Sequence, residues 1–226
     1  MEFPPILVIN LDSRQDRWAK IQESFSHWPV RLERVSAVKA DKGWMGCRDS
    51  HIKCIKIAKE RKYPWVLVLE DDCLPTQTSF TQFSELLPTL WESLKCRQSP
   101  QSPQTWNVFL GGVTSLISQH LLQTAPPLFE VKAYTTHFCL YPAESYDTII
   151  SVAMEKPFPI DLNFRKSPII KEVCTTPFLA VQAPGISDIE SGKIQDYRYL
   201  FTNAERVLAN ILKSTPAISA EKASQP

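Results

Sequence analysis

The stretch VLVLEDDC, residues 66–73, joins four aliphatic residues to the adjacent carboxylates of Glu70, Asp71 and Asp72. The aliphatic run predicts a buried strand, whereas three neighbouring negative charges repel one another unless something offsets them. Alternate side chains of a strand share a face, so we expect Glu70 and Asp72 to converge and Asp71 to point the opposite way. Ligands of open α/β sheets bind outside the carboxyl ends of the strands. The sequence therefore predicts a site where this strand ends.

Glu70 and Asp72 together have the chemistry of a site for one hard divalent cation that also takes oxygens from a substrate diphosphate. The alternative is a solvated turn in which Asp72 or a neighbour caps the following segment. Three acids directly after the strand favour the metal or phosphate site, because their like charges must be offset. The acids alone do not separate a sugar-nucleotide transferase from a metal-dependent phosphohydrolase.

The segments before this strand alternate between predicted strands and helices. PPILVINL and VRLERVSAV are predicted strands. The apolar spacing within residues 18–28 predicts a helix between them, opened by Ser13 and Asp16 as a capping box. The loop KADKGWMG then precedes a second helix, which is predicted to begin at Asp49 or Ser50. This alternation predicts an α/β fold with a mostly parallel sheet flanked by helices.

The second half of the chain is predicted to be mixed rather than doubly wound. EKPFPIDLNFRKSP is too rich in proline for regular structure, and TPFLAVQAPGISDIESG is predicted to be a strand that runs into a loop; both are candidate site loops. Residues 214–226 have too little apolar content to fold and are predicted to be a disordered tail. The other predicted elements are a helix over 80–94, a strand in WNVFLGG, extended structure in FEVKAYTTHFCLY, a helix opened by Pro142 and a helix over 204–212.

Composition disfavours two classes of partner. The 226 residues carry 25 Lys and Arg against 24 Asp and Glu, so neither a nucleic acid nor a membrane surface is indicated. No apolar run approaches the roughly 20 residues that span a bilayer, and the start of the chain lacks the features of a signal peptide; a cytoplasmic protein is expected. The six cysteines are scattered and are interpreted as reduced thiols, and their spacing disfavours a structural zinc site.

Several stretches, taken in order, resemble glycosyltransferase family 25, which includes bacterial lipopolysaccharide glycosyltransferases and the collagen-hydroxylysine galactosyltransferases. ILVINLDSRQDRW, RVSAV, GWMGCRDSH and VLVLEDD are similar to successive motifs of that family. NVFLGG, YTTHFCLYP, PFPIDLNF and SDI are similar to its later segments. The resemblance covers about residues 5–190.

The resemblance implies an inverting transferase of GT-A fold that uses a nucleotide sugar, commonly UDP-galactose, and Mn²⁺ or Mg²⁺. The cation would be held by an acidic motif of the aspartate-x-aspartate kind, here Glu70 to Asp72 with glutamate leading. A single GT-A domain over residues 1–213 is expected, with a donor and metal half over about 1–115 and an acceptor half over about 125–200. Compared with the family, the chain is short at its C-terminus, and its loop near residue 100 matches no family segment. The acceptor therefore stays open among glycan, glycolipid and protein hydroxyls.

Three residues of the first motif, Asn10, Asp12 and Arg17, match positions that line the nucleotide pocket in the family, and Asp71 is assigned to the donor with them. Arg17 could neutralise diphosphate. The alternative is that Ser13 or Asp12 caps the helix while Arg17 pairs with Asp16 or with solvent. Ser50 and His51, at the expected helix start, are predicted to donate hydrogen bonds to phosphate; a structural role for His51 is the alternative.

Asp161, flanked by prolines and apolar residues, is the predicted general base because partial desolvation would raise its basicity. A turn-forming role is the alternative. Asp188 is the second candidate for the base, or an acceptor or metal ligand. His137 is predicted to bind the acceptor, or to face the core, and Trp44 either shapes the donor pocket or fills core space. A non-catalytic module that binds nucleotide sugar or acts as a scaffold is the rival to the enzyme.

Overall fold

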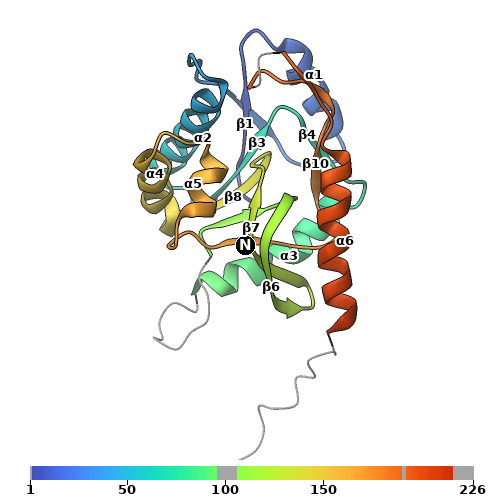
Figure 1. The fold of residues 1–226 in the computed structure, drawn as a ribbon. Coiled ribbons are helices and arrows are strands. Elements are labelled where there is room, and N and C mark those ends of the chain that lie inside the picture. The colour runs from blue at the N-terminus through green and yellow to red at the C-terminus, as the bar shows by residue number, and fades with distance from the viewer. Residues whose placement is uncertain (1, 96–105, 190–191, 216–226) are drawn as a thin grey trace, which may run out of the picture.

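The aliphatic run before the acids forms the central strand β3, Trp65–Glu70, whose first five residues are buried. A computed structural model describes residues 2–95, 106–189 and 192–215. Within these ranges β3 belongs to an eight-stranded sheet of order β2-β1-β3-β8-β5-β9-β7-β6, with helices packed on both faces (Figure 1). The protein is therefore an α/β protein built around one large sheet.

The N-terminal part of the sheet is parallel, as the alternation of elements predicts. Strand β1, Ile6–Asn10, pairs in parallel with β2, Leu32–Ser36, on one side and with β3 on the other. Helix α1, Gln15–Ser24, connects β1 to β2, and helix α2, Gly43–Glu60, connects β2 to β3. The carboxyl ends of the three strands consequently meet at one edge of the sheet.

The remaining sheet is mixed. Strand β3 pairs antiparallel with β8, β8 pairs antiparallel with β5, and β5 pairs in parallel with β9. The pairs β7–β9 and β6–β7 are antiparallel, while β4–β10 and β11–β12 form two small separate sheets. The bounds are β4 Cys73–Pro75, α3 Ser79–Lys95, β5 Val108–Leu110, β6 Thr114–Thr124, β7 Pro127–Tyr134, β8 Phe138–Pro142, a 3₁₀ turn Ala143–Ser145, α4 Tyr146–Glu155, α5 Ile160–Lys166, β9 Glu172–Cys174, β10 Ala180–Gln182, β11 Gly185–Ile186, β12 Ile194–Gln195 and α6 Arg198–Ser214.

Two predicted helix starts are wrong. No side chain caps the first helix, which begins after Arg14, so the capping box of Ser13 and Asp16 is absent. Helix α2 begins at Gly43, several residues before the predicted cap at Asp49 or Ser50. The glycines of GWMG suggested a loop, but Gly46 lets the helix lie against the backbone of residue 38, from which an added Cβ would be only 2.5 Å away. Tertiary packing therefore overrides the local preference.

The proline-rich segment also departs from the prediction, because it contains helix α5. Pro159 stands at the N-cap position of this helix, where a proline removes no intrahelical hydrogen bond. Strand β6 was not predicted. The predicted tail from residue 214 lies outside the described residues, except for residues 214 and 215.

The core occupies both faces of the sheet, which explains why β1 and β3 are apolar at every position except their last. Alternate residues of β1 and β3 enter opposite clusters: Leu7 and Val66 pack with α2, α4, α5 and α6, whereas Ile6 and Leu67 pack with α1 and α3. Among the described helices, none is both long and apolar enough to cross a membrane.

Gly112 offers a test of this packing. An added Cβ at Gly112 would lie 2.1 Å from the backbone oxygen of Ala180, whereas at Gly185 nothing lies within 4 Å. We expect Gly112→Ala to lower the free energy of unfolding by about 1–3 kcal/mol because the backbone at β10 must shift. Gly185→Ala is the matched control and should change it by less than about 1 kcal/mol. Urea denaturation of both variants measures the difference; equal stabilities would contradict the tight approach.

Candidate functional site

The three carboxylates after β3 each have a different set of partners. Glu70 Oε1 accepts a hydrogen bond from Thr136 Oγ1 at 2.8 Å and lies 3.3 Å from His51 Nε2. Strand pairing ends at Glu70, and residues 71 and 72 form a turn. The alternation of faces therefore stops there, and Asp71 lines the same cavity as Glu70 and Asp72 instead of pointing away.

Arg17 supplies the positive charge that the acidic run requires. Its Nη1 donates to Asp71 Oδ1 at 2.8 Å and to Asp72 Oδ2 at 3.4 Å, and its Nη2 donates to the carbonyl oxygen of Ile186 at 2.6 Å. Asn10 Nδ2 completes the contacts of Asp71 at 2.7 Å. A guanidinium from α1 thus lies between two carboxylates at the end of β3, where sequence reasoning had expected a metal ion alone.

Burial acts differently on the acids. The pKa of Asp72 is raised to about 7, first because burial disfavours its charge and then because the Glu70 carboxylate repels it. For Glu70, burial also favours the neutral form, but the hydrogen bond and charge of His51 outweigh it, so the pKa of Glu70 is lowered. The pKa of Asp71 is raised by burial, against the opposing effect of Arg17. The cluster therefore holds its charge on Glu70 and resists charging Asp72.

Two cavities meet at Glu70. The first, about 340 Å³, is lined by Asn10, Arg17 and the three acids. The second, about 430 Å³, is lined by residues that include Trp44 and Asp161. Five residues line both cavities: Cys47, Glu70, Gln182, Ile189 and Gln195. The polar edge of the parallel strands therefore opens into one region with two compartments.

The two aspartates proposed as bases lie in different compartments. Asp161, in the first turn of α5, lines the second cavity and accepts hydrogen bonds from the backbone N–H of Leu162 at 2.7 Å and of Thr135 at 3.3 Å. Burial raises the pKa of Asp161. Asp188 lines the first cavity, forms an ion pair with Arg14 and lies 3.9 Å from Arg17.

Two predicted site residues lie outside both cavities. Asp12 is exposed and bonds to Arg34 Nη2 at 2.6 Å, outside both cavities. His137 is fully buried, with its ring 5.1 Å from that of Phe201, and lines neither cavity. The structure therefore does not bring these two residues into the site.

Ser50 and His51 are in the interior of α2 rather than at its start, so the predicted phosphate site on free helix N–H groups is wrong. The Ser50 hydroxyl donates to the Gly46 carbonyl oxygen at 2.6 Å and accepts from the backbone N–H of Val38 at 2.8 Å. It nevertheless lines the first cavity. His51 is fully buried behind Glu70.

Four residues of the site were missed in the sequence. Gln182 Nε2 lies 3.3 Å from Asp72 Oδ2, and Arg14 pairs with Asp188, while Thr136 and Cys47 both approach Glu70. A spacing of four residues between Cys47 and His51 would have placed both on one helix face. The prediction that the helix began after Cys47 concealed this pattern.

No family model and no curated protein matches the chain. Among solved structures, one match is a Bacillus anthracis protein assigned as a glucose-1-phosphate thymidylyltransferase, crystallised in complex with sucrose. That chain is 11% identical, the match covers 89% of this chain and 75% of that chain, and the TM-score is 0.38. A score at this level does not establish a shared fold, so the class follows from the geometry alone: a mixed α/β sheet with helices on both faces and a polar cleft at its parallel edge.

The raised pKa of Asp72 has a consequence for stability. Its carboxyl normally titrates near 3.8 and here titrates at about 7, so between these values only the folded chain keeps the proton. The contribution of Asp72 to stability is therefore present below about pH 4 and is lost as the pH rises through about 7. Asp72→Asn should be more stable than the parent by on the order of 2 kcal/mol at about pH 8, with the difference vanishing near pH 4.

Asp196→Asn is the control for this measurement. Asp196 is paired with Arg198, which lowers the pKa of Asp196 to about 2, so its replacement should give no gain in stability at high pH. Guanidinium denaturation across the pH range measures both variants. A constant difference between Asp72→Asn and the parent at all pH values would show that Asp72 is ionised without cost.

Proposed function

We propose that the chain is a metal-dependent, inverting glycosyltransferase of GT-A architecture that moves a hexose from a UDP-sugar to a saccharide or another hydroxyl-bearing acceptor. Galactose is the first candidate sugar, and glycan or lipopolysaccharide synthesis is the expected setting. The observation that carries the proposal is the pair of adjoining cavities that share Glu70, one lined by acids, an amide and Arg17 and the other by Asp161. A donor and an acceptor need two such compartments with a common boundary.

The first cavity suits a nucleoside diphosphate. Arg17 presents a guanidinium, the group best matched to phosphate oxygens, and Asn10 adds an amide beside it. The second cavity is more aromatic, with Trp44, Tyr134 and Tyr197 in its wall. Apolar and aromatic walls with a few polar groups are typical of small-molecule sites, which supports the second compartment as the place for an acceptor.

The carboxylate oxygens of Glu70 and Asp72 are ligands of the kind that a hard divalent cation prefers. Glu70 and Asp72 both line the first cavity, and the Glu70 charge opposes ionisation of Asp72. With His51 neutral, three ionised acids and the guanidinium of Arg17 would leave two negative charges, which a divalent ion would balance. When bound, Mn²⁺ or Mg²⁺ would supply charge stabilisation for the departing diphosphate. Glu70 and Asp72 are the residues proposed to hold it.

Asp161 is the first candidate for the general base. It lies in the second cavity, and its raised pKa makes it more basic than an exposed aspartate. Asp188 lies in the first cavity and is paired with Arg14, which favours a role in positioning that guanidinium. In the proposed reaction Asp161 accepts the proton of the acceptor hydroxyl as its oxygen attacks the anomeric carbon on the face opposite UDP.

Calorimetry of UDP binding tests the donor site. We expect the parent to bind UDP at least about tenfold more tightly with Mn²⁺ than with EDTA, because the diphosphate and the acids each supply only part of an oxygen shell. Asp72→Asn should lose most of this gain. Asp147→Asn, on the exposed face of α4, is the control and should keep it. Equal UDP affinity in both conditions would remove the donor-metal site from the proposal.

Asp161→Asn tests the base. The amide keeps the size of the side chain but cannot take the proton, so transfer from UDP-sugar should fall about 10²- to 10⁴-fold in kcat. Binding of UDP and Mn²⁺ should change little because both belong to the other cavity. If Asp188→Asn instead abolishes transfer with donor binding intact and Asp161→Asn does not, Asp188 is the base. If neither transfer nor donor hydrolysis occurs in the parent, the non-catalytic binding module replaces the enzyme.

A further inference from the structure

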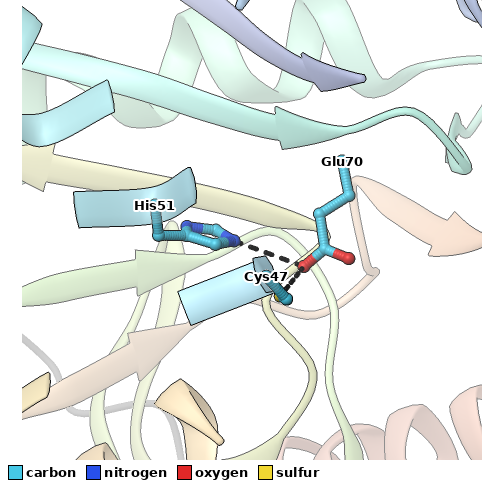
Figure 2. A group of neighbouring side chains, drawn as sticks. All are labelled: Cys47, His51 and Glu70. Carbon is cyan, nitrogen blue, oxygen red and sulfur yellow. Dashed lines mark hydrogen bonds and ion pairs between the residues drawn. The ribbon is translucent and has the colours of Figure 1, made fainter. Parts of the chain in front are cut away.

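Cys47, His51 and Glu70 bring three different metal-binding atoms together (Figure 2), and Cys47 and Glu70 line both cavities. Cys47 Sγ lies 3.9 Å from Glu70 Oε1, His51 Nε2 lies 3.3 Å from the same oxygen, and all three ligand atoms are within 4.8 Å of one another. Zn²⁺ binds such ligands at ~2.0–2.3 Å, so tetrahedral donor atoms stand roughly 3.3–3.6 Å apart. His51 Nε2 and Glu70 Oε1 already have this separation. Cys47 Sγ lies 3.9 Å from Glu70 Oε1 and no more than 4.8 Å from His51 Nε2, so it would have to move closer by less than about 1.5 Å, the length of a carbon–carbon bond.

Two neighbouring secondary-structure elements position these three side chains. Cys47 and His51 lie four residues apart on one face of α2, and Glu70 ends the adjacent strand β3. The hydroxyl of Tyr141 lies 3.1 Å from the other ring nitrogen of His51, Nδ1. A partner on the second nitrogen orients the ring of a metal-binding histidine. Because a hydroxyl both donates and accepts, Tyr141 can also serve the Nδ1–H form of His51 that leaves Nε2 free.

We propose that Cys47, His51 and Glu70 form a three-ligand site for a thiophilic divalent cation such as Zn²⁺, with its fourth position open to the cavities. Both Cys47 and Glu70 line the two cavities, which provides a path for the ion and a place for a water or substrate oxygen. The mixed sulfur, nitrogen and oxygen set selects Zn²⁺ or Co²⁺ over Mg²⁺ and Mn²⁺. Three protein ligands and an open position distinguish this site from a closed structural zinc site.

This site differs from the one assigned to the donor cation in every ligand except Glu70. Thiolate and carboxylate together balance a divalent charge, and binding releases the thiol proton. Where the proposed function holds, the two cations compete for Glu70, so Zn²⁺ would antagonise donor binding. The existence of the thiophilic site does not depend on that function.

Titration of the reduced, metal-free protein with Co²⁺ tests the proposal through the thiolate-to-cobalt charge-transfer absorption. The parent should develop this band with one equivalent of Co²⁺, and Zn²⁺ should abolish it. Cys47→Ser should lose the band, and His51→Gln should weaken Co²⁺ binding by at least about tenfold. Cys54→Ser is the matched control, since Cys54 lies on the same helix and is fully buried within the apolar core, and it should keep the band.

A second measurement uses the unaltered chain. Saturation with Zn²⁺ should slow alkylation of Cys47 at least about tenfold, read on its own peptide by mass spectrometry, because a coordinated thiolate is withdrawn from reaction. Absence of the cobalt–thiolate band in the parent, its survival in Cys47→Ser, or unchanged alkylation of Cys47 with Zn²⁺ would each overturn the site. Asp72→Asn should keep the band while losing the Mn²⁺-dependent gain in UDP affinity, which separates failure of this site from failure of the proposed function.

Discussion

The contact of Arg17 with Asp71 and Asp72 is the interaction on which the cleft depends. Both carboxylates are largely buried, and an unpaired buried charge costs several kcal/mol. Arg17 also donates to the carbonyl oxygen of Ile186 in β11. One side chain therefore connects helix α1, the end of β3 and the distant β11 segment, and it lines the first cavity together with residues of the β2–α2 segment.

The three neighbouring acids are all largely buried, but their pKa values differ because they have different hydrogen-bond partners. Glu70 lies on the inner side, where His51 and Thr136 supply donors, so it keeps its charge. Asp72 has Gln182 and a longer contact to Arg17, and its proton is correspondingly hard to remove. The local sequence does not distinguish Glu70 from Asp72. The difference comes from the hydrogen-bond donors that β10 and the segment before β8 contribute. The chemistry of the edge thus depends on long-range pairing.

Sequence patterns predicted the central strands and the existence of the long helices, because buried parallel strands and amphipathic helices leave strong hydrophobic periodicities. The helix bounds were less well predicted: α2 starts early where Gly46 fits against the backbone of residue 38, and α6 begins at Arg198 rather than at residue 204. Helix α5 was missed because its prolines were taken to exclude regular structure, although Pro159 stands at the N-cap and does not interrupt it. For the site, the three acids were predicted because ligands of open α/β sheets bind where the strands end, and Asn10 and Arg17 were assigned by motif position. Gln182, Arg14 and Thr136 were not, because a single sequence carries no record of which distant segments meet. Asp12 and His137 were assigned by motif position and lie outside the cavities.

Glu70 is the residue through which the two compartments are linked, and charge limits what it can serve at one time. With Arg17 in place and His51 neutral, ionisation of all three acids would leave a residual charge of minus two, which one divalent ion at the proposed Glu70 and Asp72 position would neutralise. A thiophilic ion at Glu70 and the thiolate of Cys47 is neutral by itself, and Asp71 is then balanced by Arg17 when Asp72 holds its proton. The two proposed cation positions would share Glu70, so an ion in one position changes the charge available to the other. The protonation state of Asp72 would differ between the two.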